Sequence, residues 1–187
     1  MATTLGSGID VVGFLKEQHE QIKRRFAEVR DTHGAERTKA FYSLRRLLAV
    51  HETAEEEIVH PAARRSIENG ESVVQARLEE EIEAKKILAQ LETIEIDASE
   101  FDTLFSRLER SVLAHVQAEE RDEFEHLANV LDHRQLQSMR KAAEFAEKIA
   151  PARPPSALES PPTNILAGPF AAMMDHARDA LVGKATG

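Results

Sequence analysis

The feature that most constrains this chain is a helical repeat of apolar residues that runs through four long segments. In the first segment, the residues Val12, Leu15, Ile22 and Phe26 recur at steps of three, four or seven positions, which is the spacing of one buried helix face. The sequence nowhere shows the strict alternation of apolar and polar residues that is typical of a half-buried strand. The chain is therefore predicted to be all-α.

Turn signals divide the repeat into separate helices. Asp10 is a predicted N-cap, and Gly34 is expected to end the first helix. Pro61 is expected to kink or end the second helix, because proline removes a backbone hydrogen-bond donor. Further turns are expected at Asn69 and near Ser99, where a new N-cap would lie. Four long helices joined by short turns favour an up-down-up-down four-helix bundle, with extra C-terminal helices after it.

Three parts of different character are expected along the chain. Residues 1–9 form a small, polar, flexible N-terminus, and residues 10–150 form the bundle with an appended helix near 134–149. Residues 151–187 form a proline-rich linker, which is stiff and extended, followed by an amphipathic helix near 169–182. The apolar face of that last helix is expected either to dock onto the bundle or to bind a protein partner or a second copy.

The composition excludes several classes of function. The chain has 33 Asp and Glu against 24 Lys and Arg, a formal net charge of −9, whereas nucleic acids and anionic membranes require a basic surface. It has no cysteine, which excludes disulfides, Fe–S clusters and thiol nucleophiles. No apolar run approaches the roughly 20 residues of a membrane span, and no secretory signal is visible. The cytoplasm is the expected location.

Ligand-type side chains interrupt the apolar face of every long helix. When each apolar series is continued at helical spacing, a histidine or a glutamate falls among residues that are predicted to be buried. The candidate metal ligands are His19 in the first helix, His51 and Glu55 in the second, Glu81 in the third, and His115 and Glu119 in the fourth.

These candidate ligands are expected to lie at one level of the bundle. His19 lies 15 residues before the turn at Gly34, and His51 lies 17 residues after it. The corresponding offsets in the second pair of helices are 16 and 18 residues from Asp97. At about 1.5 Å per residue, these offsets agree to within about one helical turn. Unpaired buried carboxylates are costly by several kcal/mol each, so metal ions that neutralise them are the favoured explanation.

An internal repeat indicates two metal ions rather than one. Both halves of the chain end in the same spacing, His51-x-x-x-Glu55 and His115-x-x-x-Glu119, so two similar helical hairpins can present matching half-sites. Imidazole and carboxylate ligands together suit iron, and also zinc or manganese. The residues alone leave the choice among these metals open.

Other acidic residues and histidines are assigned different roles. Glu52 follows His51 by one residue, so it lies beside the apolar face and is an open case as a ligand. His60 lies off that face, and it is expected to support the site from outside or to lie at the surface. The residues expected in solvent or in ordinary packing are Glu56, Glu57, Glu120, His33, His126, His133 and His176.

Four segments resemble the core helices of the hemerythrin-like (HHE cation-binding) family. They read LKEQHEQIKRRF, VHETAEEEIVHP, LEEEIEAKKILAQLE and LAHVQAEERDEF, and they occur in the family's order with similar separations. The resemblance covers about residues 10–131 and implies a metal pair, usually iron, between the helices. The positions that match family ligands are His19, His51, Glu55, His115 and Glu119, with the two glutamates as bridging carboxylates.

The third helix departs from the family pattern. The family normally has a histidine where this chain has Glu81, in the run Glu79-Glu80-Glu81. A carboxylate at that position makes the site richer in hard oxygen ligands, which favour ferric iron and disfavour reversible oxygen carriage. Glu80 lies about 100° round the helix from Glu81, so its replacement is expected to have little effect.

The resemblance leaves three functions open. The preferred one is a non-haem di-iron protein that reacts with or senses O2, peroxide or NO. The second is a catalase-like enzyme that disproportionates peroxide. The third is a non-catalytic module that senses iron or oxygen and passes the signal through the C-terminal helix.

Overall fold

The computed structural model describes residues 9–149, and within this range the chain is helical without any strand. The predicted all-α class is therefore confirmed. The four long helices are α1 (Val11–Asp31), α2 (Gly34–Ala54), α4 (Gly70–Leu91) and α5 (Ser99–Glu119). The shorter helices are α3 (His60–Ser66), α6 (Glu125–Val130) and α7 (His133–Ile149), and two π-helical turns are η1 (Glu55–Val59) and η2 (Glu120–Phe124).

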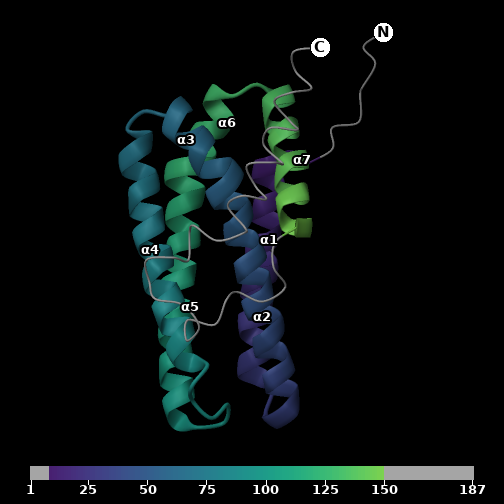
Figure 1. The fold of residues 1–187 in the computed structure, drawn as a ribbon, viewed down its shortest axis with the longest axis vertical. Helices are drawn as coiled ribbons and strands as arrows, with labels where there is room; N and C mark the ends of the chain where they lie inside the picture. Colours follow the sequence, from purple (N-terminus) through teal and green to yellow (C-terminus); the bar gives the residue numbers. More distant parts are fainter. Residues whose placement is uncertain (1–8, 150–187) are drawn as a thin grey trace. The chain divides into compact units, whose positions relative to one another are not determined.

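The long helices form two antiparallel hairpins that pack together as a four-helix bundle. Helix α1 packs along α2, and α4 packs along α5, as Figure 1 shows. Helix α7 returns along the bundle and packs against α1, α2 and η1. None of the helices in residues 9–149 is both long enough and apolar enough to cross a membrane.

The helix ends agree with the predicted turns in part. Asp10 caps α1 by accepting a hydrogen bond from the Gly13 N–H at 3.0 Å. Gly34 begins α2 rather than ending α1, and its φ of +56° is one that glycine adopts readily. The N-cap of α5 is Ala98 rather than Ser99. The carboxylate of Asp97 instead accepts the Gly34 N–H at 2.9 Å, which joins the two hairpin turns.

Pro61 does not end the second helix, because a π-helical turn precedes it. The backbone N–H of His60 bonds to the carbonyl of Glu55, five residues back. Pro61 then occupies the first turn of α3, where its missing N–H is tolerated. The chain thus continues from α2 through η1 into α3, and η2 repeats the arrangement between α5 and α6.

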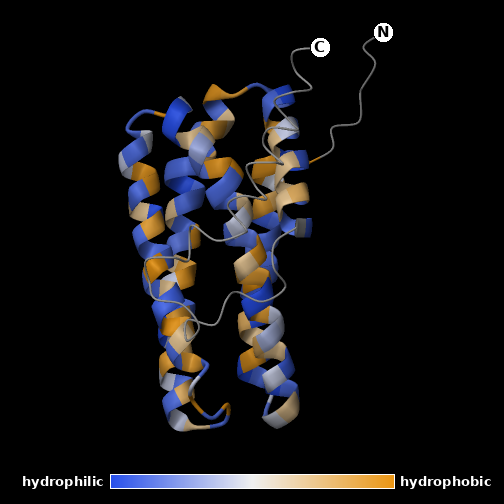
Figure 2. Ribbon diagram, viewed as in Figure 1, coloured by the Kyte–Doolittle hydropathy of each residue, from blue (hydrophilic) through white to orange (hydrophobic). Residues whose placement is uncertain are grey.

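The apolar core consists of two clusters with the candidate ligands between them. One cluster lies toward the two hairpin turns, and the other lies toward α3, α6 and α7. In α1, Leu15 belongs to the second cluster and Ile22 to the first, so His19 lies between them. Figure 2 shows apolar residues recurring along each long helix, as one buried face requires.

The predicted linker and last helix at 151–187 lie outside the described residues, as do residues 1–8. The boundaries proposed for these parts stay predictions.

Candidate metal centre

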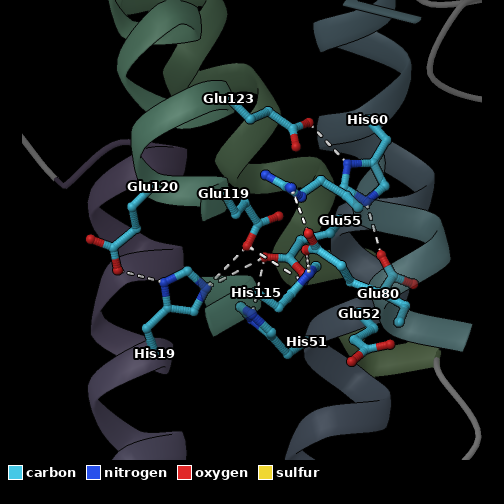
Figure 3. A network of polar contacts seen from close by, with 12 residues as sticks. His19, His51, Glu52, Glu55, His60, Glu80, His115, Glu119, Glu120 and Glu123 are labelled. Atoms are coloured by element: carbon cyan, nitrogen blue, oxygen red, sulfur yellow. Dashed lines mark hydrogen bonds and ion pairs between the residues drawn. The ribbon is translucent and has the colours of Figure 1, made fainter. Parts of the chain in front are cut away.

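Four candidate ligands gather at the centre of the bundle, as Figure 3 shows. The ligand atoms of His19, His51, Glu55 and Glu119 all lie within 4.8 Å of one another. Nε2 of His51 lies 3.0 Å from a Glu55 oxygen, and Nε2 of His19 lies 3.3 Å from a Glu119 oxygen. Both glutamates are 0% exposed, so water does not compensate their charge. The i,i+4 spacing places Glu55 beside His51, whereas Glu119 meets the imidazole of His19 from another helix.

His115 faces the same carboxylates from α5. Its Nε2 lies 4.0 Å from an oxygen of Glu119, one turn further along its own helix. Its ring is buried. The structure therefore brings five of the predicted ligands to one level, as the offsets from the hairpin turns had indicated.

Each of the three imidazoles is fixed through its other ring nitrogen. Nδ1 of His19 donates to Glu120 at 2.7 Å. Nδ1 of His51 donates to the Gln18 side chain at 2.8 Å, and Nδ1 of His115 donates to Glu80 at 3.0 Å. Metal-binding histidines in proteins characteristically donate their free N–H to a carboxylate or other oxygen, which fixes the tautomer and aims the second nitrogen.

The inward atoms have no hydrogen-bond partner among the described residues. They are Nε2 of His19, His51 and His115, together with both carboxylate oxygens of Glu55 and Glu119. Buried polar atoms are satisfied in the large majority of cases, and leaving one unsatisfied costs about 1–3 kcal/mol, more for charged groups. Converging imidazole nitrogens and carboxylate oxygens are the donor set that suits iron, zinc or manganese. The residues present therefore fit a metal centre.

When no metal is bound, protons on the side chains can compensate part of the negative charge at this centre. Burial alone would lower the pKa of His19, but its contacts with Glu119 and Glu55 outweigh burial and raise the pKa to about 10. Burial and the neighbouring charge of Glu55 raise the pKa of Glu119 to about 8. Burial also acts on Glu55, yet His51 and His19 hold its pKa well below the usual value. A metal-free centre is thus partly protonated at neutral pH.

Glu81 and Glu52 form a second acidic group on the side of the centre that faces Lys85. Their ligand atoms lie within 4.8 Å of one another and of Glu56. The Lys85 ammonium lies 3.0 Å from Glu81 and 3.2 Å from Glu52. Burial would raise the pKa of Glu81, but His60 and Lys85 lower it to about 2. Both oxygens of Glu81 have partners, His60 on one and Lys85 on the other.

His60 lies inside the bundle and not at its surface, with only 1% of the residue exposed. Its Nδ1 lies 2.9 Å from Glu123, and its Nε2 lies 3.1 Å from Glu81. Ligand atoms of His60, Glu119 and Glu123 form a third group within the same 4.8 Å limit. Sequence reasoning gave no role to Glu123, which lies in η2 beyond the end of α5.

Two glutamates that were expected to matter little instead hold imidazoles, whereas three histidines lie at the surface as expected. Glu120, expected in solvent, is 30% exposed and holds His19. Glu80, expected to matter little, holds His115. His33, His126 and His133 are exposed, as expected, and His176 lies outside the described residues.

Fold and site together define a class of protein, a helical bundle that can hold metal ions with histidines and glutamates from its core helices. The sequence model of the Hemerythrin HHE cation binding domain matches residues 10–127. The chain belongs to this family.

Two relatives and one solved structure place the chain more closely. It is 28% identical over 134 residues to an uncharacterised hemerythrin-like protein of Schizosaccharomyces pombe, a match that covers 71% of this chain and 66% of that protein. It is 27% identical over 148 residues to a DNA nickase of Nostoc sp., covering 77% of this chain and 41% of the nickase. The chain thus spans less than two thirds of the length of either relative.

The fold is shared with a solved structure, that of a hemerythrin HHE cation-binding domain-containing protein from Mycobacterium kansasii. The TM-score is 0.68 at 18% identity, and the match covers 75% of this chain and 86% of that one. At this identity the likeness supports the fold and not a particular chemistry.

Proposed function

We propose that this chain holds two iron ions between its core helices and that it reacts with or senses O2, peroxide or NO. The observation that supports this function best is the orientation of the three imidazoles. Each is held through Nδ1 and presents an unpartnered Nε2 to unpartnered carboxylate oxygens in a buried space. That arrangement costs folding free energy without metal and is relieved by metal binding.

The proposed ligands divide between two half-sites. His19 and His51 would hold one ion and His115 the other, with the carboxylates of Glu55 and Glu119 available to both. Glu81 and Glu52 are proposed as further carboxylate ligands from the side that faces Lys85. A bound iron pair would supply a Lewis acid and a redox-active centre for a small ligand. The chain's own contribution is a buried group of carboxylates with fixed imidazoles.

The proposed protein acts on a small ligand in the cytoplasm. The ligand is small, since the centre lies between two apolar core clusters. We infer no DNA-related role from the nickase, because the net charge of −9 opposes phosphate binding. A cytoplasmic location is proposed from the cysteine-free composition.

One contact favours a sensing module as the second candidate function. The Gln18 amide that holds His51 also donates to Glu147 in α7 at 2.5 Å. A change at His51 therefore has a direct hydrogen-bonded route to the last helix that the structure describes. A catalase-like enzyme, by contrast, would need turnover of peroxide, and its test is kinetic.

Metal analysis combined with optical spectroscopy tests the proposal. The purified chain, expressed in iron-rich medium, should carry close to two irons. Its visible absorption should change when O2, peroxide or NO is added to the reduced protein. Sustained peroxide consumption would favour the catalase-like enzyme, whereas a stoichiometric spectral change would favour a sensor. A chain that contains a single zinc, or no transition metal, would contradict the di-iron function.

A further inference from the structure

His60 is a buried histidine close to the metal centre that the family's ligand pattern does not use. Both of its ring nitrogens face carboxylates, Nδ1 toward Glu123 and Nε2 toward Glu81, and Figure 3 shows its ring pointing into the bundle. Its burial rules out the surface position that the sequence analysis allowed, and leaves the choice between a supporting residue and a ligand.

Glu119 lies between His60 and the rest of the centre. Its carboxylate belongs both to the group with His19, His51 and Glu55 and to the group formed with Glu123 and one ring nitrogen of His60. Both oxygens of Glu119 and Oε2 of Glu123 lack hydrogen-bond partners among the described residues, although both side chains are 0% exposed.

At Nδ1, His60 is held in the manner of the three proposed ligand histidines, although its Nε2, unlike theirs, already contacts a carboxylate, that of Glu81. Its Nδ1 meets an oxygen of Glu123 at 2.9 Å, as Nδ1 of His19 meets Glu120 and Nδ1 of His115 meets Glu80. An imidazole fixed by a carboxylate at Nδ1 offers Nε2 to a metal. The distance from His60 Nε2 to Glu81 Oε1 is 3.1 Å. Two ligand atoms about 2.1 Å from one ion, in neighbouring octahedral positions, lie about 3 Å apart.

In the internal repeat, His60 and Phe124 occupy corresponding positions. Five residues after Glu119 comes Phe124, whose ring stacks on His19 at 5.5 Å. Five residues after Glu55 comes His60, which contacts Glu81. In the half-site of His19, the long helix α1 therefore provides the imidazole, and Phe124 of the π-helical turn η2 provides an apolar neighbour. In the other half-site the positions are exchanged: the imidazole of His60 follows the π-helical turn η1, and the long helix α4 provides the carboxylate of Glu81.

We propose that His60 supplies, through Nε2, a second imidazole to the half-site of His115, and that Glu123 positions it. This inference rests on the proposed two-metal function and deepens it. It replaces the family's helix-three histidine by a histidine from the opposite hairpin. Glu81 is then a neighbour of His60, held from the other side by Lys85, and its loss costs less than the loss of His60.

Cobalt(II) titration of the metal-free full-length chain tests this assignment. Cobalt is a divalent probe whose visible absorption reports bound ions and their ligands. The wild type should bind two ions. His60→Gln keeps a polar side chain of similar reach, yet it should bind one ion tightly and the second at least 100-fold more weakly. Glu123→Gln should weaken the second ion by about 10–100-fold, as expected for loss of a positioning contact. His126→Gln, on the surface, is the matched control.

A rescue variant separates ligation from general damage. In His60→Gln combined with Glu81→His, the imidazole returns to the family position, and two-ion binding should be restored. Circular dichroism of the metal-free variants checks that each one folds. If His60→Gln binds two ions with the wild-type spectrum, or if only Glu81→Ala loses an ion, the assignment to His60 is wrong while the metal pair stands. If the wild type binds fewer than two ions, the proposed function fails first and the assignment fails with it.

Discussion

At the scale of single residues, the side chains that aim the imidazoles matter as much as the candidate ligands. Glu120, Gln18 and Glu80 each accept a hydrogen bond from one ring Nδ1. Without these contacts each ring could rotate about its own bonds. The cost would then appear in metal affinity and not in the fold.

Replacing Glu80 gives a direct test of this role. Glu80→Ala should weaken metal binding by about 10–100-fold, because His115 loses the oxygen that fixes its tautomer. Glu79→Ala is the matched control, since Glu79 is exposed on the same helix and accepts a hydrogen bond from the Gln75 side chain rather than from a histidine. Competition with a chelator of known affinity measures the difference. Equal metal affinities for the two variants would mean that Glu80 has little effect on the site, as its position on the helix had suggested.

Glu81 controls charge near the centre whether or not it binds metal. Glu81→His removes a buried negative charge, so a reduced, less positive iron pair should become easier to form. We expect a higher reduction potential than in the wild type, measured by spectroelectrochemical titration of the iron-loaded protein. Glu83→His, an exposed position on the same helix, should leave the potential unchanged. A potential that falls or stays constant in Glu81→His would contradict the charge argument.

At the scale of secondary structure, the π-helical turns explain what sequence patterns could and could not predict. The long helices and the common level of the ligands follow from a 3.6-residue period, and both were predicted. On that period, residue 60 lies about 140° round the helix from residue 55, so His60 seemed to face away. The bond from the His60 N–H to the Glu55 carbonyl changes this register. The residues of the segment Glu55–Val59 do not themselves predict this change of helical register.

The sequence patterns also could not predict which side chains contact each other across neighbouring helices. Glu80 and Gln18 each lie one residue before a candidate ligand in sequence, yet they serve histidines on neighbouring helices. Periodicity reports which face of a helix is buried, but it does not report which neighbour that face meets. The partners of His19 and His60 in η2 were missed for the same reason.

The turn between α3 and α4 depends on glycine in a way that can be measured. A Cβ at Gly70 would lie 2.3 Å from the Ala63 carbonyl oxygen and 2.9 Å from Arg64 Cα, both backbone atoms. Gly70→Ala should therefore destabilise the chain by about 1–3 kcal/mol, as overpacking does. Gly13→Ala is the control, because its Cβ would meet mainly the flexible Ile9 side chain. Urea denaturation of both variants measures the effect, and equal stabilities would contradict the close approach.

At the scale of the whole bundle, the metal centre separates the two apolar clusters and so affects the stability of both. Metal removal leaves uncompensated carboxylates between them, whereas metal that binds only the folded state stabilises it by mass action. The melting temperature should drop clearly when a chelator strips the metal, and it should recover on reconstitution with iron. Differential scanning calorimetry provides the measurement. An unchanged melting temperature in a sample shown to be metal-free would mean that the polar layer satisfies itself.

Metal binding should also release protons. In the metal-free chain, the pKa of His19 is raised to about 10 and that of Glu119 to about 8, so both carry protons at pH 7. A metal ion must displace these protons, so its apparent affinity should rise steeply as pH increases from 6 to about 8 and less steeply from there to about 10. Calorimetric titrations in two buffers of different ionisation enthalpy count the protons released. A pH-independent affinity would contradict the protonated centre.

The hydrogen bonds that run from His51 through Gln18 to Glu147 have a mechanical consequence. Glu147 lies in the last turn of α7, close to the end of the described residues. Two hydrogen bonds thus tie the orientation of the His51 ring to the position of that turn. A rotation of the ring would pull on the end of α7, and a shift of that end would rotate the ring.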